Sequence, residues 1–254
     1  MSSPRLMDSK RIHRLLFGVY YQEDILDRFS RLAPAAIRAA APRALAGARR
    51  RNLIFLHVPR AAGTSISYAL YGSHCIQHHR AACLKAMAPQ FWNATESFAV
   101  VRDPMDRFAS SYAFVRAGGT QSCRLSDVFR AKTAHISCVD DYLSFIEERT
   151  VFELDFVMRP QSWFVCDPQS GLPLVRRLFL YGRDQVSLLA YLRPHGINAL
   201  PWLNRSLRIP LVLSRRQKLR VEKIYEADLG LVNLLTAWRG AGDGLLSATS
   251  VAAE

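Results

Sequence analysis

The residues best suited to chemistry form one short run, HVPRAAGTS, at positions 57–65. Gly63 tolerates backbone angles that other residues avoid, and Thr64 and Ser65 supply N-cap chemistry for a helix that starts there. A loop of this kind points backbone N–H groups and a helix N-terminus at one place, with Arg60 beside it. The run therefore predicts an anion site for phosphate or a related group.

A second run, FAVVRDPMDRFASSY at positions 98–112, joins an apolar stretch to a helix start. Asp103 is the predicted N-cap, and Pro104 stands at the first helical position, where its missing N–H costs nothing. Arg102 and Ser110 can meet an anion at the carboxyl end of the strand, where open α/β sheets bind their ligands. This run predicts a second anion site.

The elements that must position these residues follow from apolar runs. Residues 53–58 have the length and composition of a buried parallel strand, and Pro59 ends the run. Residues 97–102 predict a second strand and residues 174–181 a third, while 139–148 and 184–192 predict helices. At 254 residues the chain can bury one full core, so a single α/β domain is expected.

The first run is not a Walker A loop, because no Lys precedes Thr64. It resembles the 5′-phosphosulfate loop of sulfotransferases that use 3′-phosphoadenosine 5′-phosphosulfate (PAPS), usually H-[VI]-P-K-T-[AG]-[GS]-T-S. Arg60 stands where that family normally has Lys. The second run resembles the family's 3′-phosphate element, F-x-[FV]-V-R-[DEN]-P-x-x-R-x-x-S-x-Y. Weaker likenesses include PWLNRSLR at positions 201–208 and the pair of Tyr225 and Asp228.

The resemblance implies a fold and a set of site residues. The fold is α/β, a three-layer α/β/α arrangement with a central, mainly parallel sheet, similar to P-loop NTPases. The residues implied to bind PAPS, or its product adenosine 3′,5′-bisphosphate (PAP), are Arg60, Ala61, Ala62, Gly63, Thr64, Ser65, Arg102 and Ser110. Arg60 is also expected to stabilise charge during transfer. For Arg107 we expect a structural pairing role.

Two adjacent histidines follow the first predicted strand and helix. In the resembled family a His or carboxylate here is the base for the acceptor hydroxyl, so we predict His79 as the base, then His78, then an acid later in the chain. A capping or surface histidine is an equally weighted alternative. Adjacent spacing without a second cluster predicts no metal site. Gln161, in RPQSWFV, is expected either to line the acceptor cleft or to pack in the core.

Composition limits the partners and the compartment. The chain carries 34 Lys and Arg against 21 Asp and Glu, a formal charge of +13, which favours an anionic partner. No zinc-finger, RNP or helix-turn-helix pattern is present, so no nucleic-acid partner is expected. Five cysteines without CxxC spacing favour a reducing compartment. With no run long enough to span a bilayer, we expect a soluble protein in a cytoplasmic, bacterial context.

Residues 1–51 predict a basic helical arm, with eleven basic and four acidic residues. Ile12, Leu15, Leu16 and Val19 form one helical stripe, which indicates a helix packed on the domain or, alternatively, a membrane-surface or polyanion contact. The sulfotransferase domain is predicted at 52–238. Residues 239–254 are expected to be a mobile tail.

The sequence thus favours transfer of a sulfuryl group from PAPS to a hydroxyl, with a carbohydrate or glycan as acceptor. Two other classes stay open at this point: a nucleotide kinase or ATPase of the P-loop type, and a non-catalytic polyanion-binding module. The acceptor's identity and the oligomeric state do not follow from the sequence.

Overall fold

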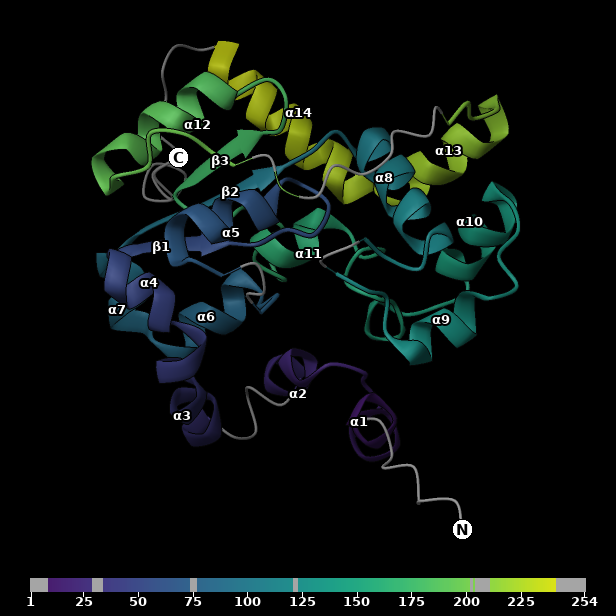
Figure 1. Cartoon of the computed structure of the whole chain (residues 1–254), viewed down its shortest axis with the longest axis horizontal. Coiled ribbons are helices and arrows are strands. Elements are labelled where there is room, and N and C mark those ends of the chain that lie inside the picture. Colours follow the sequence, from purple (N-terminus) through teal and green to yellow (C-terminus); the bar gives the residue numbers. More distant parts are fainter. Residues whose placement is uncertain are drawn as a thin grey trace.

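The structure, a computed structural model, describes residues 9–28, 34–73, 77–120, 123–201, 203 and 211–240. Helices cover both faces of a central sheet, which makes a three-layer α/β/α fold (Figure 1). The elements in chain order are α1 (Ser9–Phe17), α2 (Gln22–Arg28), α3 (Pro34–Ala44), α4 (Ala46–Arg51), β1 (Leu53–Leu56), α5 (Gly63–Tyr71), α6 (Ala81–Met87), α7 (Pro89–Ala94), β2 (Glu96–Val101), α8 (Pro104–Arg116), α9 (Asp127–Thr133), α10 (Val139–Glu147), η1 (Val151–Glu153), α11 (Gln161–Val165), β3 (Arg177–Leu180), α12 (Gln185–Leu192), η2 (Arg193–His195), α13 (Arg215–Ile224) and α14 (Glu226–Gly240).

The sheet of the described residues has three parallel strands in the order β1-β2-β3. Phe55 pairs with Phe98, and Val100 pairs with Phe179. All three strands lie between helices, which is why their sequences are apolar runs rather than alternating ones. The α/β class, the parallel sheet and the layered architecture predicted from the sequence are confirmed.

Alternate side chains of the strands fill two separate apolar clusters. Ile54 and Leu56 belong to the cluster beneath one face, which also includes side chains of α3, α4, α6, α7, α11 and α14. Phe55, one position along, packs on the other face with side chains of α5 and α12. Because side chains alternate along a strand, each strand contributes to both layers at once.

A third apolar cluster lies beside the sheet, built by α8, α9, α10 and α13. Helix α8 begins as predicted: the Asp103 carboxylate accepts the backbone N–H groups of Met105 (2.9 Å) and Asp106 (3.1 Å). Phe108 from α8 and Tyr142 from α10 are buried at the centre of this cluster. It thereby fixes the direction in which α8 leaves the end of β2.

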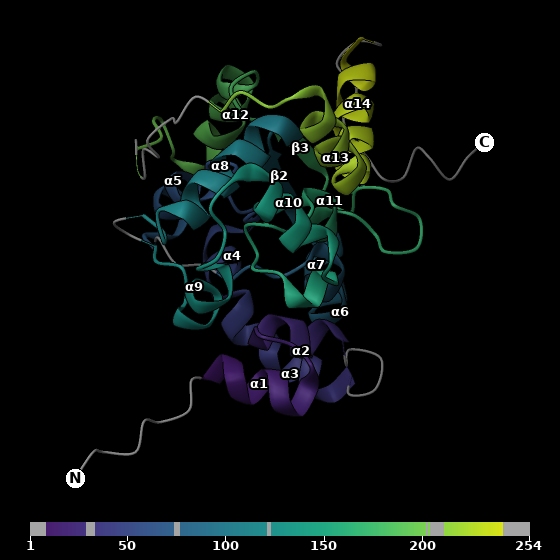
Figure 2. The ribbon, with the colours of Figure 1, turned by 90° about the vertical axis from the view of Figure 1, so that its right-hand side faces the viewer.

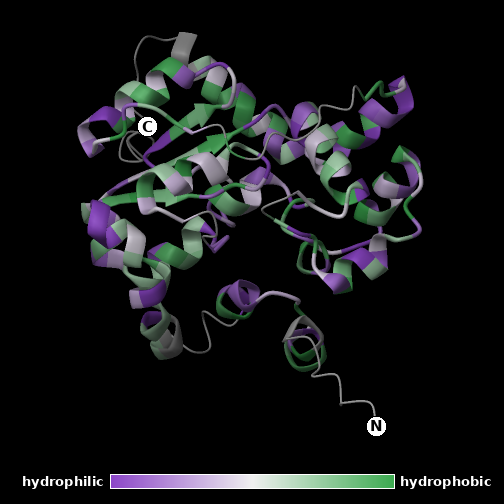
Figure 3. Cartoon of the chain, viewed as in Figure 1, coloured by the Kyte–Doolittle hydropathy of each residue, from purple (hydrophilic) through white to green (hydrophobic). Residues whose placement is uncertain are grey.

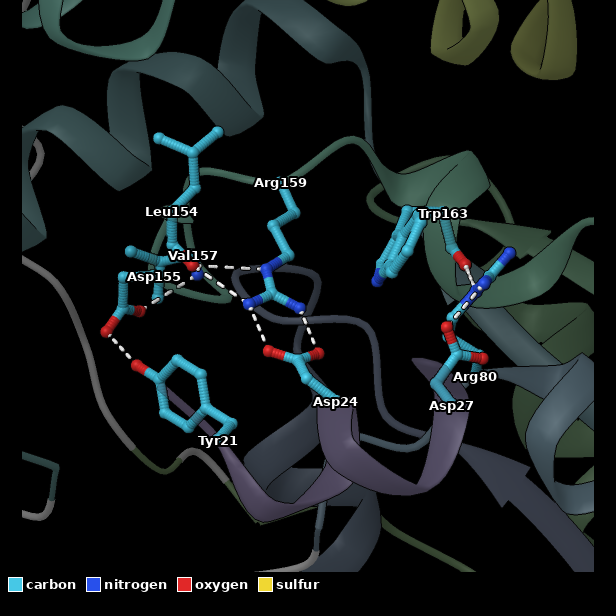
Figure 4. A network of polar contacts seen from close by, with 9 residues as sticks. All are labelled: Tyr21, Asp24, Asp27, Arg80, Leu154, Asp155, Val157, Arg159 and Trp163. Atoms are coloured by element: carbon cyan, nitrogen blue, oxygen red, sulfur yellow. Dashed lines mark hydrogen bonds and ion pairs between the residues drawn. The ribbon is translucent and has the colours of Figure 1, made fainter. Parts of the chain in front are cut away.

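Helices α1, α2 and α3 lie together at one end of the molecule (Figures 1 and 2). Side chains of α2 and of the preceding Tyr21 point into the remainder of the chain (Figure 4). Arg159 donates two hydrogen bonds to the Asp24 carboxylate, at 2.6 and 2.7 Å, and both side chains are buried. Arg80 donates to Asp27 at 2.7 Å, and Tyr21 donates to Asp155. The division at residue 51 stays a prediction, but α2 is held to the chain by buried charge.

We expect Asp24→Ala to lower the free energy of unfolding by about 3–5 kcal/mol. The reason is that Arg159, which is fully buried, would keep its charge without the carboxylate that now accepts two of its N–H groups. Urea denaturation of the variant measures the loss. The double variant Asp24→Leu/Arg159→Met should recover part of it, because it removes both buried charges.

A matched control for the buried pair is the exposed pair of Arg130 and Asp127 on α9. Arg130→Ala should cost less than about 1 kcal/mol, since exposed pairs are screened by solvent. If Asp24→Ala cost as little as this control, the buried pair would not fasten α2.

The predicted stripe of the N-terminal segment is only partly buried. Val19 is fully buried, whereas Leu15 and Leu16 on α1 are 77% and 66% exposed. No helix in the described part of the chain combines the length and the apolar character that a bilayer crossing requires. Most of the predicted tail, residues 241–254, lies outside the described residues.

Candidate active site

The loop after β1 turns sharply before α5 begins. Arg60 (φ +67°) and Ala62 (φ +63°) both have left-handed backbone, and Ala62 is the N-cap of α5 without any side-chain cap. The expectation that Thr64 and Ser65 cap the helix is therefore wrong: this double turn starts the helix at Gly63, so both hydroxyls lie inside its first turn. Two strained residues in one loop are typical of ligand clamps.

Gly63 is required by the close approach of His57. A Cβ atom at position 63 would lie 1.7 Å from His57 Cδ2, so no larger residue fits there. The ring of His57 is buried against the helix start. This contact sets the loop close to the N-terminus of α5, whose first backbone N–H groups have no partner within the helix.

Arg60 joins the two predicted anion sites. Its Nε and Nη2 donate to Ser110 Oγ on α8, at 3.1 and 2.8 Å, and its guanidinium lies 4.9 Å from the centre of the Phe114 ring. Burial, followed by the charges of Arg102 and Arg107, lowers the pKa of Arg60 to about 10. The side chain therefore keeps its positive charge at neutral pH.

Arg107 holds the loop through its backbone. It is buried, and its Nε donates to the carbonyl of Pro59 at 2.9 Å, which is consistent with the structural role expected for it. Burial lowers its pKa, and the carboxylate of Asp228 opposes this effect. Its Nη2 is buried and has no hydrogen-bond partner among the residues that the structure describes.

Arg102 is fixed at the end of β2 through its backbone. Gln161 accepts from Arg102 N and donates to Arg102 O, both at 2.7 Å, and its side chain is buried. The Arg102 guanidinium lies 5.1 Å from the centre of the Tyr181 ring and 3.7 Å from Asp106. Its Nε, like Arg107 Nη2, is a buried donor with no partner in the described part of the chain.

Three arginines thus gather where β1 and β2 end. Unpaired buried N–H donors are costly unless a ligand or water satisfies them, and clustered cations raise the local affinity for anions. The two left-handed loop residues and the start of α5 add backbone donors on the same side. This arrangement fits a ligand that carries more than one phosphate or sulfate group.

A family model described as a sulfotransferase family matches residues 44–179, more than half of the chain. The chain belongs to the sulfotransferase family. The match includes both loops and all three arginines. Comparisons with curated proteins and with solved structures gave no significant match.

The candidate bases of this sulfotransferase lie beside His57, the residue that directly follows β1. The His78 Nδ1 donates to the carbonyl of His57 at 3.1 Å, and its ring packs between His57 and Phe156, with centroids 4.5 and 5.1 Å away. Burial lowers the pKa of His78. Packed in this way, His78 has the contacts of a structural residue.

His79 differs from His78 in having one ring nitrogen without a partner among the described residues. Its Nε2 lies 2.9 Å from Gln77 Oε1, which accepts a hydrogen bond in the tautomer that carries the proton on Nε2, and the buried Nδ1 has no partner among the described residues. Burial, and then the neighbouring His78, lower the pKa of His79 to about 4. The ring is therefore neutral at pH 7, and it is a weaker proton acceptor than an ordinary histidine.

His79 also lines a cavity of about 300 Å³ along the outer edge of β1. The polar side chains around this cavity are those of Arg43, Arg50, His57, Tyr71, Ser73, Gln77 and His79. His57 lies between the cavity and Gly63 of the loop. His57 contacts both His78 and Gly63, and it therefore connects the two histidines to the loop after β1.

Sequence reasoning missed three contributors to the site: His57, Phe114 and Tyr181. Tyr181 directly follows β3, so the rule that parallel strands end at one edge could have placed it beside Arg102.

Gln161 packs in the core against Arg102 rather than lining a cleft. Within the described residues no three His, Cys, Asp or Glu side chains group to hold a metal ion. The PWLNRSLR segment lies largely outside the described residues.

Proposed function

We propose that this sulfotransferase transfers a sulfuryl group from PAPS to a hydroxyl of a carbohydrate or glycan. The observation that carries the proposal is the contact between Arg60 and Ser110, because it joins the loop suited to a 5′-phosphosulfate to the helix suited to a 3′-phosphate. A donor with phosphate at both ends of one nucleoside suits two linked anion sites. Family membership favours sulfuryl transfer over the kinase and the polyanion-binding alternatives.

The roles of the residues follow from their positions. Backbone N–H groups of residues 61–65 and the Arg60 guanidinium would hold the 5′-phosphosulfate, while Arg102 and Ser110 would hold the 3′-phosphate. Arg107 keeps the loop in place through Pro59. When bound, PAPS supplies an activated sulfuryl group whose S–O bond to phosphate breaks.

Sulfuryl transfer requires the protein to stabilise the leaving phosphate and to remove a proton from the acceptor. Negative charge grows on the leaving phosphate, and preorganised cations and N–H donors stabilise it, as in phosphoryl transfer. Arg60 meets this need as a permanent cation. The acceptor oxygen must lose its proton as its bond to sulfur forms, and His79 Nδ1 is the base that we assign to it.

We place the sugar ring of the acceptor in the cavity at His79, from which the reacting hydroxyl would have to pass His57 to reach the sulfuryl group at the loop. The volume of the cavity is at the lower end of small-ligand sites, about the size of one sugar residue. The amide nitrogen of Gln77 can donate to a sugar hydroxyl, whereas the Tyr71 hydroxyl is already bonded to the backbone of Leu53 and Phe55. Arg43 and Arg50 add positive charge at the cavity wall, which favours an acceptor that carries an acidic group. The cytoplasmic location stays a prediction.

Calorimetry with PAP and with adenosine 5′-phosphate tests the proposed donor site. We expect PAP to bind roughly tenfold to a hundredfold more tightly than adenosine 5′-phosphate, because hydrogen bonds to a charged group usually contribute that much to affinity. Arg102→Ala should remove this advantage, because Arg102 would no longer meet the 3′-phosphate. Arg216→Ala, an exposed arginine on α13, is the matched control and should bind like the parent protein.

Equal affinity for the two nucleotides would contradict the donor assignment. ATP turnover that requires magnesium would instead support the kinase alternative. Binding of sulfated polymers without any nucleotide binding would support the polyanion module.

A further inference from the structure

Helix α1 turns its apolar side to solvent. Leu15 and Leu16 are 77% and 66% exposed and Ile12 is 37% exposed, although their spacing places them on one face of the helix. In Figure 3 this helix lies at the edge of the molecule with hydrophobic residues in its ribbon. Single exposed leucines are ordinary, but a clustered set on one helix face marks a contact surface.

The contacts that hold α1 come from its polar side. Arg14 donates to Glu153 at 2.9 Å and to the carbonyl of Gly18 at 2.8 Å, and its guanidinium lies 5.7 Å from the centre of the Tyr20 ring. The helix is therefore attached through Arg14, while its leucines are exposed to solvent. This is the reverse of the usual packing of a surface helix on a globular domain.

The sequence of this segment is basic. Helix α1 has the sequence SKRIHRLLF, with three basic and no acidic residues, and the first 51 residues carry a net +7. A helix that combines an apolar face with Lys and Arg suits an interface of lipid chains and anionic headgroups. A second copy of this chain suits it less, because a two-fold interface would bring the same positive charges together.

We propose that the Leu15–Leu16 face of α1 binds the surface of an anionic membrane. The leucines enter the boundary between headgroups and acyl chains, and the basic residues of the segment attract the anionic headgroups. Helix α2, fastened by Asp24 and Arg159, then ties the bound helix to the folded chain. This inference concerns where the protein acts and does not depend on the proposed reaction.

Co-sedimentation of the full chain with vesicles tests the proposal. We expect binding to phosphatidylcholine vesicles that contain phosphatidylserine, and at least roughly tenfold weaker binding to phosphatidylcholine alone. The variant Leu15→Ser/Leu16→Ser should lose roughly tenfold or more in affinity for the mixed vesicles. Its thermal midpoint should stay unchanged, because both side chains are exposed.

The matched control is Val186→Ser/Val212→Ser, which removes two apolar side chains elsewhere that are even more exposed than the leucines. It should bind the mixed vesicles like the parent protein. A second readout is Leu16→Trp, whose fluorescence should be quenched by brominated lipids in the mixed vesicles. If the leucine variant binds as well as the control, or if light scattering shows a dimer that only the leucine variant dissociates, the membrane assignment is overturned.

Discussion

Replacing Arg60 with alanine is expected to lower turnover by roughly two to three orders of magnitude. The guanidinium belongs to the loop that would receive the leaving phosphate, and alanine removes both its charge and its two donors to Ser110. Steady-state kinetics with PAPS and a saccharide acceptor measures the effect. The loss should fall on kcat more than on KM, because the charge that Arg60 stabilises grows during transfer.

Arg60→Lys should retain most of the activity at neutral pH, because it keeps the positive charge. The same burial and the same neighbouring arginines that lower the pKa of Arg60 should also lower the pKa of a lysine there. The lysine variant should therefore lose activity toward alkaline pH sooner than the parent protein. Arg216→Ala is again the control. A near-normal rate in Arg60→Ala would remove Arg60 from the catalytic assignment.

His79→Ala is expected to lower kcat by roughly two to four orders of magnitude, the usual contribution of a general base. The pH profile gives the sharper test. Since the pKa of His79 is lowered to about 4, the ring is neutral above that pH. The enzyme should therefore lose activity as the pH falls through about 4. The acid limb of the kcat/KM profile should lie there, rather than near the ordinary histidine value of about 6.5.

His79→Gln separates proton transfer from packing, because glutamine keeps a polar side chain in the cavity but accepts no proton. It should lose activity and abolish the acid limb near pH 4. His135→Ala, an exposed histidine, serves as the control and should change neither. His78→Ala should lower stability and move the limb upward in pH, because the His78 ring contributes to the lowered pKa of His79. A limb that stays in place in His79→Gln would identify another base.

The strands and the two strand-to-helix loops could be predicted from local sequence. A strand buried on both faces needs a continuous apolar run, and residues 53–58 provide one. The strand ends earlier than predicted, at Leu56, because His57 leaves the ladder to pack against Gly63. The start of α8 was equally readable, since Asp103 and Pro104 carry local capping preferences.

Other features depend on geometry that no local pattern encodes. The left-handed backbone of Arg60 is unusual for a residue other than glycine, so neither it nor the resulting contact with Ser110 could be read from the sequence. The sequence predicts the apolar face of α1 but not whether that face packs on the protein or faces solvent. Periodicity shows that a face is apolar without showing what covers it. The pair of Asp24 and Arg159 has no local signature.

The pair of Asp24 and Arg159 also has a consequence for synthesis. Asp24 leaves the ribosome 135 residues before the arginine that neutralises it. At ordinary elongation rates this leaves α2 without its buried partner for on the order of ten seconds. During that interval the leucines of α1 have been synthesised, but the segment to which the N-terminal helices attach has not. We therefore expect the N-terminal helices to dock last, after the segment that contains Arg159 has been made.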